Sequence, residues 1–264
     1  VETWVPSRLR GLTREIHRRA EAAVCVSPAV AESVLRNGID AERVHVVRNG
    51  VDLERLRERA AEPSPLPDAR APRVVAVGRL SQEKAFDLLL EAHAAARTGV
   101  PHELVILGEG PLLTSLRALA DALGTRDSVL LPGYVPNPFP VVAGAAAFVL
   151  SSRTEGATLS LIEALALGVP VIATRCGSGV EEVLGHGDFG LLVEPGSPRA
   201  LTEALERHLR DPAGLRARAA AASGHVARYD ARETARAFAG ILAATAAGRA
   251  KGAGGASAAR GVKA

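Results

Sequence analysis

The segment AAFVLSSRTEGATLSLIEALALGVPVIAT, residues 146–174, holds the pattern that decides the fold. It begins and ends with short apolar runs, 146–152 and 169–174, which have the length and composition of buried strands. Between them, residues 158–167 are apolar almost all the way round a helix, so this helix must be covered by its neighbours. Strand, helix and strand in this order predict a βαβ unit, whose two strands lie parallel in one sheet.

The same alternation extends to both sides of this unit. Continuous runs of Val, Ile and Leu between turn residues are typical of parallel strands that are covered on both faces. The sequence therefore predicts an α/β fold, a Rossmann-like parallel sheet with helices on both faces, over residues 73–228. Ligands of such a sheet bind at the carboxyl ends of its strands. The further predicted strands are 73–80, 102–110, 128–135 and 190–194.

The segments that flank this domain differ from it in composition. Residues 53–72 include EPSPLPDARAP, whose four prolines predict a linker or an exposed loop. Residues 229–245 have a helical pattern, and the Ala- and Gly-rich tail 246–264 is expected to be disordered. Residues 1–52 carry only short strand and helix patterns. The chain has no Met, even at position 1, so we expect it to be a piece of a longer protein.

The composition is that of an ordinary globular protein, with 47% hydrophobic residues, 23% charged residues and a net charge of +3. Its two cysteines, Cys25 and Cys176, lie far apart, which argues against a disulfide scaffold or a structural zinc site and fits a reducing compartment. No uncharged apolar run approaches the roughly 20 residues that span a bilayer, and no signal peptide begins the chain. We therefore expect a cytoplasmic protein.

The basic segment 7–19 leaves two interpretations open. A basic amphipathic helix can lie on anionic lipid, which would place the protein peripherally at the inner face of the cell membrane. The alternative, which we favour, is a helix that packs on a missing domain with its charges solvated. We expect no nucleic-acid partner.

Glu163 is an unusual residue for a helix that looks buried. A buried carboxylate needs hydrogen-bond donors or a cation, or its pKa rises until it is neutral. Glu163 could lie on a thin exposed strip and pair with a surface Arg. It could equally face a ligand at the carboxyl edge of the sheet, where two adjacent ribose hydroxyls would be a natural pair of donors. The helix alone does not decide between the two.

Two cations and a helix start are predicted at the same edge. Arg79 and Lys84, in GRLSQEK, lie between the end of one strand and the start of the next helix. Thr158 is a predicted N-cap, after which unpaired backbone N–H groups attract anions. Each feature alone is commonly just solvated surface, but together they favour a diphosphate. The glycine turn 108–111 allows a close approach of backbone to a ligand.

Taken together, these segments resemble a known family. EGATLSLIEALALGVPVIAT resembles the E-x7-E signature of the retaining glycosyltransferases of family 4, which have the two-domain GT-B architecture. The resemblance covers about residues 14–243 and implies a C-terminal donor-binding half, with residues 1–52 as a remnant of the N-terminal acceptor-side domain. The agreement continues, in the order which that family uses, in VRNGVD (47–52), VAVGRLSQEKAFDLLLEA (75–92), LVILGEGP (104–111), LLPGYVP (130–136) and GLLVEPGSP (190–198).

The resemblance implies a role for each matching residue. Arg79 and Lys84 match the pair that binds the donor diphosphate, and Glu163 matches the Glu that holds the ribose. Glu155 matches the Glu beside the donor sugar and the reacting centre, so Glu155, Arg79 and Lys84 are the predicted catalytic residues. No Asp-x-Asp motif is present, which agrees with an enzyme that needs no metal and no cofactor. The other predicted donor-binding residues are Gly108, Glu109, Gly110, Tyr134, Val135, Gly156, Ala157, Thr158, Leu159 and Ser160.

The sequence departs from the family pattern at three places. Ala85 stands where the family usually has Gly, residues 174–184 are a less usual form of a loop near the donor sugar, and most of the first Rossmann domain has no counterpart. The predicted function is a retaining glycosyltransferase that moves a sugar from a UDP-linked donor to a glycan, lipid or lipid-linked acceptor. The alternative is a nucleotide-sugar-binding module that is inactive without a separate N-terminal domain. A GT-B-fold sugar-nucleotide epimerase agrees less well with the ordered motifs.

Overall fold

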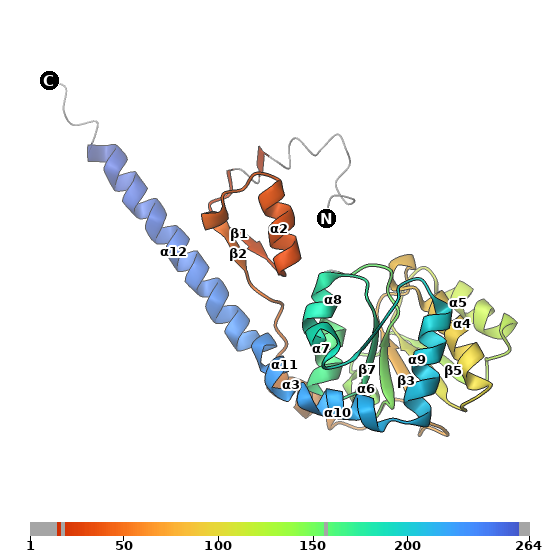
Figure 1. The fold of residues 1–264 in the computed structure, drawn as a ribbon. Helices are drawn as coiled ribbons and strands as arrows, with labels where there is room; N and C mark the ends of the chain where they lie inside the picture. The colour runs from red at the N-terminus through yellow and green to blue at the C-terminus, as the bar shows by residue number, and fades with distance from the viewer. Residues whose placement is uncertain (1–14, 17–18, 156–157, 259–264) are drawn as a thin grey trace. The chain divides into compact units, whose positions relative to one another are not determined.

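The computed structural model describes residues 15–16, 19–155 and 158–258. The chain divides into two compact units (Figure 1). The larger unit spans Val51–Asp230, and the smaller unit combines Val1–Gly50 with Ala231–Ala264. The predicted domain, 73–228, lies within the larger unit, which also includes the expected linker 53–72, and the smaller unit combines segments from both ends of the chain.

The larger unit contains a six-stranded parallel sheet with the strand order β5-β4-β3-β6-β7-β8, which confirms the predicted α/β fold class. The order reverses where β3 pairs with β6, with Val74 opposite Ala147 and Val75 opposite Phe148. In sheets of this kind, ligands bind outside the carboxyl ends of the strands at such a reversal. The strands are β3 (Arg73–Val77), β4 (Glu103–Leu107), β5 (Val129–Gly133), β6 (Ala147–Leu150), β7 (Val171–Thr174) and β8 (Leu191–Val193).

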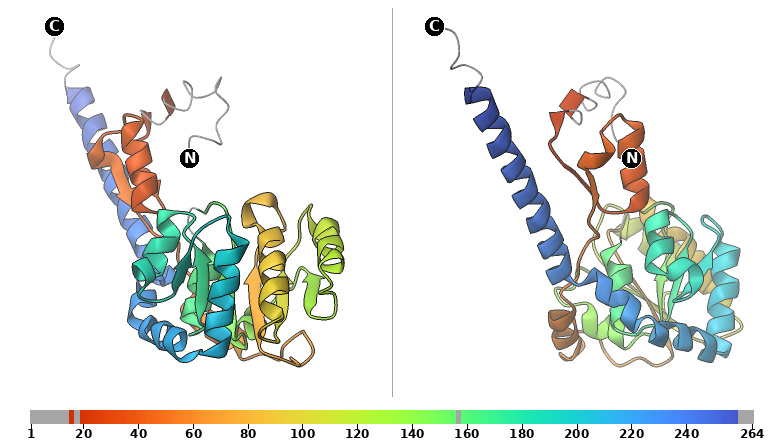
Figure 2. Two further views of the ribbon diagram at one scale, coloured as in Figure 1. Left: turned by 45° about the vertical axis from the view of Figure 1, so that its right-hand side comes forward. Right: turned by 60° about the vertical axis from the view of Figure 1, so that its left-hand side comes forward.

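Helices cover both faces of this sheet, as both views in Figure 2 show. Neighbouring strand residues point to opposite faces, so Val75 belongs to one hydrophobic cluster while Val74 and Ala76 belong to the other. The first cluster packs against α3 (Leu53–Ala60), α6 (Phe139–Ala143), α7 (Leu159–Ala166), α8 (Ser178–Val183) and α11 (Ser223–Val226). The second packs against α4 (Phe86–Arg97), α5 (Leu113–Ala122), α9 (Pro198–Arg210) and α10 (Ala213–Ala221).

Helix α7 is buried, as its apolar sequence predicted. Leu161, Ile162, Ala164 and Leu165 are each at most 2% exposed, whereas Glu163 between them is only half-buried. The helix packs against β6 and β7, the strands before and after it in the chain. The βαβ unit therefore has the arrangement expected from residues 146–174.

The expected linker, 53–72, is not a free connection. Its first part forms α3, because the Asp52 carboxylate accepts a hydrogen bond from the Arg55 backbone N–H at 3.0 Å and Leu53 and Leu56 are buried. Its Pro-rich part is held against the sheet by hydrogen bonds to Arg73 and Glu103. The prolines exclude a helix here, but they do not prevent a loop from packing.

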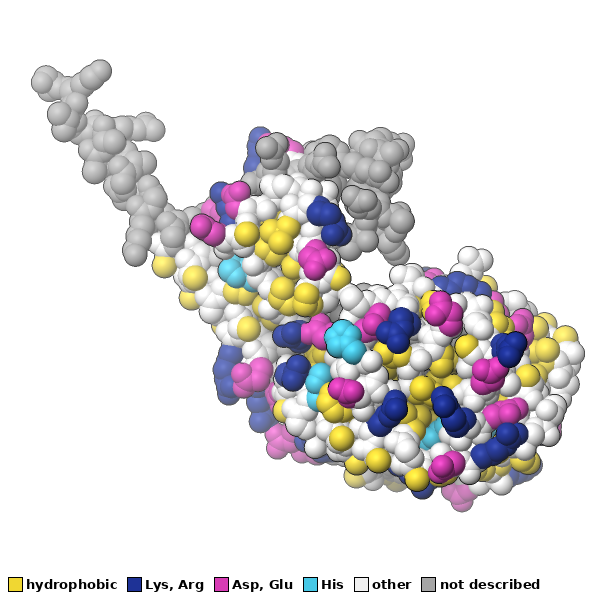
Figure 3. All heavy atoms as spheres, viewed as in Figure 1, with side chains coloured by type: hydrophobic (Ala, Val, Ile, Leu, Met, Phe, Trp, Pro, Cys, Tyr) yellow, Lys and Arg dark blue, Asp and Glu magenta, His cyan; other side chains and the backbone are white. Residues whose placement is uncertain are grey.

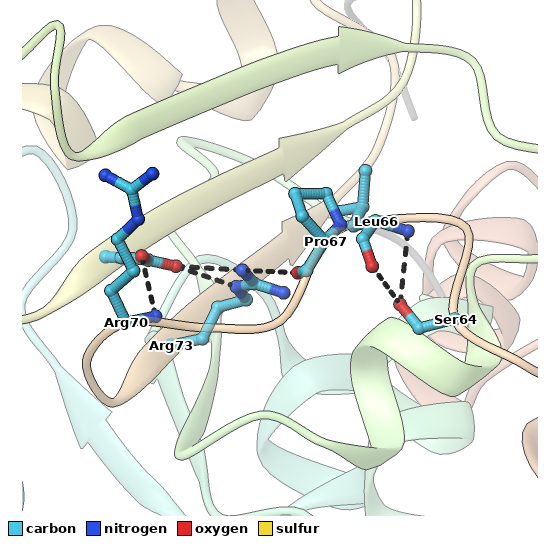
Figure 4. A network of polar contacts seen from close by, with 6 residues as sticks. Ser64, Leu66, Pro67, Arg70 and Arg73 are labelled. Atoms are coloured by element: carbon cyan, nitrogen blue, oxygen red, sulfur yellow. Dashed lines mark hydrogen bonds and ion pairs between the residues drawn. The ribbon is translucent and has the colours of Figure 1, made fainter.

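Figure 4 shows Arg70, Arg73 and Pro67 in this network of polar contacts. The Arg73 guanidinium donates to Glu103 Oε2 at 2.9 and 3.1 Å and to the Pro67 carbonyl at 3.1 Å. The Arg70 backbone N–H donates to Glu103 Oε1 at 3.1 Å. The two oxygens of the Glu103 carboxylate are thereby occupied by Arg73, the first residue of β3, and by Arg70 in the segment that precedes this strand.

The smaller unit contains two parallel strands, β1 (Ala23–Cys25) and β2 (Val44–Val46), with α2 (Pro28–Arg36) between them in the chain. Ser27 caps α2 by accepting a hydrogen bond from the Val30 backbone N–H at 3.3 Å. Apolar side chains are visible on this unit in Figure 3, and Val24, Leu35 and Val46 are among its exposed residues.

Helix α12 (Ala231–Ala258) completes the smaller unit and differs from the sequence-based expectation. We expected a helix over 229–245 and a disordered tail over 246–264, but the helix continues to Ala258. Ala has the highest helix propensity, and each Gly costs only about 1 kcal/mol relative to it, so an Ala-rich segment can remain helical despite several glycines. Residues 259–264 lie outside the described residues.

The N-terminal basic helix, predicted within 7–22, also lies largely outside the described residues. Residues 15–16 and 19 have helical conformation. Among the residues that the structure describes, no helix is both long and apolar enough to cross a membrane.

Candidate functional site

The loops that follow β3, β4, β5, β6 and β7 meet at the carboxyl edge of the sheet in the larger unit. Nearly all residues predicted from the sequence as site residues lie on these loops or in the first two turns of α7. The reversal of strand order between β3 and β6 brings together the loops that carry Lys84 and Glu155.

Lys84 and Glu155 form a close ion pair. Lys84 Nζ lies 2.6 Å from Glu155 Oε1, and the two side chains are only 19% and 11% exposed. The Ser152 hydroxyl donates a second hydrogen bond to the same carboxylate oxygen, also at 2.6 Å. Two of the three predicted catalytic residues are therefore in contact, although they are 71 positions apart in the sequence.

The backbone on either side of Lys84 is tightly determined. Lys84 ends a 3-10 helix (Gln82–Lys84), and its carbonyl accepts a hydrogen bond from the Ser151 hydroxyl at 2.9 Å. Ala85 follows in the left-handed conformation, with φ 51° and ψ 41°, and is completely buried. Left-handed backbone favours Gly, which is the residue that the family usually has at this position. The backbone conformation therefore explains the family's preference for Gly where this sequence has Ala85.

Arg79, the third predicted catalytic residue, is exposed. Its carbonyl accepts from the Ser81 backbone N–H at 2.9 Å, but its guanidinium makes no hydrogen bond or ion pair to any residue that the structure describes. Arg79 and Lys84 together lower the pKa of Glu83, after a larger contribution from the hydrogen bond of Ser81. Arg79 therefore brings to the same loop as Lys84 a cation whose guanidinium has no hydrogen-bond or ion-pair partner among the described residues.

Gly108 and Gly110 in the turn 108–111 pack closely against the backbone of residues 78–80, which the sequence did not reveal. A Cβ atom on Gly108 would lie 1.9 Å from the Gly78 carbonyl oxygen, and one on Gly110 would lie 2.4 Å from the Leu80 carbonyl oxygen. Gly108 also has φ +145°. The backbone that these glycines approach closely is thus that of residues 78–80, whereas the sequence suggested a close approach to a ligand. This arrangement leaves Glu109 exposed, with its carbonyl accepting from the Leu80 backbone N–H at 2.8 Å.

Glu163 is half-buried in the second turn of α7, and burial raises its pKa. The positive charge of Arg59 opposes this rise. Arg59 is itself fixed, because it donates to the Pro136 carbonyl at 2.7 Å and lies 5.1 Å from the centre of the Phe139 ring. No described cation lies within ion-pair distance of Glu163, and Arg59 acts on it only through the longer-range effect of its charge.

The start of α7 is the place of the predicted anion site. Thr158 is the N-cap residue, with extended backbone at φ −102° and ψ 103°. Its side chain makes no capping hydrogen bond, and its hydroxyl is buried without a partner among the described residues. Leu159 is 43% exposed and Ser160 half-buried at the first turn. Two further predicted contacts, Gly156 and Ala157, lie outside the described residues.

The last two predicted contacts follow β5. Tyr134 is 66% exposed, whereas Val135 packs against the core cluster on the α7 side of the sheet. An exposed ring at this edge is available to stack on a flat ligand, and Val135 positions the loop that carries it.

Three site residues escaped the sequence-based prediction, namely Ser151, Ser152 and Thr174. The first two are 1% exposed and bond to the Lys84 carbonyl and the Glu155 carboxylate. Thr174, at the end of β7, donates its hydroxyl to the Ser152 carbonyl at 2.6 Å. The available signal was a pair of hydroxyl residues directly after a buried apolar strand, where buried polar groups need partners.

The arrangement can bind an anion through two cations and a helix start, and hydroxyl groups through two carboxylates. Among the described residues, no group of three or more His, Cys, Asp or Glu side chains could hold a metal ion. Metal independence remains a prediction.

Comparison with known protein families gives two matches. The family described as "Glycosyl transferases group 1" matches residues 71–211, and the one described as "Glycosyltransferase Family 4" matches residues 2–55. The first match contains the whole carboxyl edge described above.

Two curated relatives are each 35% identical to this chain. One, from Campylobacter jejuni, is N-acetylgalactosamine-N,N'-diacetylbacillosaminyl-diphospho-undecaprenol 4-alpha-N-acetylgalactosaminyltransferase, which aligns over 70% of this chain and 46% of its own length. The other, from Mycolicibacterium smegmatis, is GDP-mannose-dependent alpha-(1-6)-phosphatidylinositol monomannoside mannosyltransferase, which aligns over 81% of this chain and 55% of its own length. The chain thus spans about half the length of these relatives.

Solved structures share the fold. Anabaena HepE in complex with UDP has a TM-score of 0.80 at 21% identity, over 92% of this chain and 70% of that one. Sucrose-phosphate synthase from Thermosynechococcus elongatus has a TM-score of 0.75 at 24% identity, over 94% of this chain and 64% of that one. The fold is that of the GT-B glycosyltransferases.

Proposed function

Because the chain belongs to the glycosyl transferases group 1 family, we propose that it binds a nucleoside-diphosphate sugar, most simply a UDP-sugar, and provides the donor side of a retaining glycosyl transfer. The observation that carries this proposal is the convergence at one sheet edge of Lys84, Arg79, the start of α7 and the half-buried Glu163. A nucleoside diphosphate presents anionic oxygens and two ribose hydroxyls, which are the groups that these residues complement.

Each residue then has one task. Arg79 and Lys84 bind the diphosphate, assisted by the backbone N–H groups at the start of α7, and Glu163 accepts hydrogen bonds from the ribose. As the sugar leaves, negative charge grows on the diphosphate. Groups already placed around that charge stabilise the transition state more than the ground state. This supply of positive charge supports transfer that needs no metal ion.

Relatives support the choice of substrate class. The Campylobacter jejuni relative is named for an acceptor linked to diphospho-undecaprenol, and the Mycolicibacterium smegmatis relative for a GDP-mannose donor and a phosphatidylinositol mannoside acceptor. HepE has been solved with UDP and with UDP-glucose. We propose a glycan, lipid or lipid-linked acceptor for this chain, and UDP as the first nucleotide to test.

A second candidate is a nucleotide-sugar-binding module without transfer activity of its own. It is favoured by the fact that every described residue of the site lies in one unit, Val51–Asp230. Binding and transfer therefore need separate measurements.

The test is calorimetry of the chain with UDP, GDP and ADP. We expect one of them to bind, and Glu163→Ala to weaken that binding at least ten-fold, because hydrogen bonds to a charged group contribute about 1.5–3 kcal/mol. Glu206→Ala is the matched control, since Glu206 is a half-buried Glu on α9 that pairs with Arg210. If no nucleotide binds, or if Glu163→Ala binds like the control, the assignment is wrong.

Release of free nucleoside diphosphate separates the two candidates. A transferase should release it from the bound nucleotide sugar when a polyprenyl-linked glycan acceptor is added. A binding module should show the same affinity and no release.

A further inference from the structure

Two consecutive serines at the end of β6 hold the two members of the central ion pair. Ser151 donates its hydroxyl to the backbone carbonyl of Lys84 at 2.9 Å. Ser152 donates its hydroxyl to the side chain of Glu155 at 2.6 Å. The two serines are equally buried, at 1% exposure, but only Ser152 touches a charged group. Substitution of Ser152 therefore tests the contact with the charged group, and substitution of Ser151 is the matched control.

Ser152 is itself held in place from the neighbouring strand. The hydroxyl of Thr174, which is completely buried, donates to the Ser152 carbonyl at 2.6 Å and lies 3.3 Å from the Leu150 carbonyl. The end of β6 is thereby tied to the end of β7 beyond the last backbone pair. Such buried polar networks restrict side chains to one arrangement when all members are satisfied.

The contacts of Glu155 are distributed unevenly over its carboxylate. Lys84 and Ser152 both approach Oε1, and no described residue donates a hydrogen bond to Oε2. The Glu155 backbone N–H donates to the Cys176 carbonyl at 3.3 Å. Gly177 packs so closely that a Cβ atom on it would lie 2.4 Å from the Glu155 carbonyl oxygen. The backbone and one carboxylate oxygen are thus fixed, and the second oxygen keeps its capacity to accept hydrogen bonds.

We propose that Ser152, supported by Thr174, is a positioning residue that holds Glu155 Oε1 so that Oε2 accepts a hydroxyl of the donor sugar. This inference rests on the proposed function of the site. Lys84 cannot do this alone, because a diphosphate in the site attracts the same ammonium group. When Lys84 turns toward the diphosphate, the Ser152 hydroxyl still holds Glu155, so the sugar contact survives donor binding.

The test compares Ser152→Ala with Ser151→Ala in calorimetry with UDP and with UDP-glucose. We expect Ser152→Ala to lower the affinity for UDP-glucose about five-fold while the affinity for UDP changes less than two-fold, since one hydrogen bond to a charged group is lost only at the sugar. Ser151→Ala should change both affinities by the same factor. An equal change in Ser152→Ala, or none, overturns the proposal.

Thr174→Val provides a second variant if Ser152→Ala does not fold. It removes only the hydroxyl that fixes the Ser152 carbonyl and nearly keeps the side-chain volume. A smaller shift in the same direction, again confined to UDP-glucose, is expected. Equal loss of both ligands contradicts the proposal.

A ligand-free double-mutant cycle separates this inference from the proposed function. We expect thermal unfolding of Ser152→Ala, Glu155→Ala and the double variant to give effects that fall short of additivity. The shortfall should be about five-fold in the unfolding constant, because either single substitution removes the one hydrogen bond that the two residues share. Additive effects overturn the positioning role whether or not nucleotides bind. Failure of the wild-type chain to bind any nucleotide, with coupling intact, contradicts the proposed function instead.

Discussion

At the scale of single residues, Ala85 shows how one backbone conformation controls the site. It has φ 51°, is completely buried, and directly follows Lys84. A side chain in the left-handed region costs roughly 1–2 kcal/mol, which Ala tolerates better than larger residues do. Ala85 links the 3-10 helix that ends at Lys84 to the start of α4, so this conformation lies directly beside the residue that pairs with Glu155.

We therefore predict that Ala85→Val lowers the free energy of unfolding by about 2 kcal/mol or more, because a β-branched residue is strained at positive φ and the site has no room for it. Ala85→Gly should change the free energy of unfolding by less than about 1 kcal/mol. Glycine removes the backbone strain, but the variant also loses a buried methyl group and has a more flexible unfolded state, and these effects oppose each other. Urea unfolding measures both. Equal stability of the Val and Gly variants would show that the conformation is not constrained.

At the scale of elements, the contact between the Pro-rich segment and the sheet determines how the larger unit begins. Arg73 on β3 and Glu103 on β4 are only 9% and 13% exposed, and they connect two paired strands to the loop before them. Burial alone would raise the pKa of Glu103, but the Arg70 backbone N–H and the Arg73 guanidinium outweigh burial and lower it. The carboxylate therefore stays charged in the folded chain.

Glu103→Ala is predicted to lower the free energy of unfolding by about 3 kcal/mol, because it leaves the Arg73 guanidinium buried without its charged partner. Protease cleavage within 62–72 should become faster in this variant, since the loop loses its attachment. Glu91→Ala is the control, because Glu91 is exposed on α4, and its effect should stay within about 0.5 kcal/mol. If the two variants are equally stable, the contact contributes nothing to folding.

At the scale of the whole larger unit, the two ends of the sheet differ in their electrostatics. The carboxyl end carries Lys84, Glu155 and Arg79. Near the other end, the buried side chains of His93 and His102 connect α4 with the residues that precede β4 and β5. His93 Nδ1 lies 2.9 Å from His102 Nε2, and His93 Nε2 lies 3.0 Å from the Ser128 hydroxyl. His102 Nδ1 donates to the Val100 carbonyl at 2.7 Å.

This network can form with both rings neutral. His102 then accepts from His93, and His93 Nε2 shares the Ser128 hydroxyl proton with the Thr125 carbonyl, which lies 3.1 Å from that hydroxyl. Burial, followed by the charges of His102 and Arg97, lowers the pKa of His93 to about 3, while Asp127 opposes this. Burial likewise lowers the pKa of His102. A second proton on His102 would lie between its Nε2 and the proton already on His93 Nδ1, and a second proton on His93 would occupy Nε2, which accepts from Ser128.

The sign of the pH dependence follows from this. Because the unfolded chain binds a proton at His93 below about pH 6.5 and the folded chain does not, stability is lost as the pH falls from about 6.5 toward 3, at up to roughly 1.4 kcal/mol per pH unit. His93→Gln should therefore flatten the decline of the melting temperature between pH 7 and pH 4.5. The control is His186→Asn at a side chain that is 78% exposed, which should leave the decline unchanged. Parallel curves for all three proteins would contradict the prediction.

Much of this molecule could be predicted from local patterns. The strands on either side of α7 and the burial of Leu161 and Leu165 follow from the spacing of apolar residues, which is a property of neighbouring positions. Arg79 and Lys84 were placed at the carboxyl edge because parallel strands end on the same side of a sheet. The Pro-rich residues 62–72 form an exposed loop, as predicted, but the helix Leu53–Ala60 and the continuation of α12 to Ala258 were not predicted, because packing and Ala propensity were given too little weight.

The sequence by itself determined the α/β class, and it predicted the edge at which we propose that a ligand binds and most residues of the candidate site, since these depend on periodicity and on chain direction. Only the tertiary structure decided that Lys84 pairs with Glu155, that Ser152 holds the same oxygen, and that Gly108 makes room for Gly78. The physical reason is that hydrogen bonds and close contacts act over about 3 Å. Residues as far apart in the chain as Lys84 and Glu155 come within that distance only when the sheet has formed.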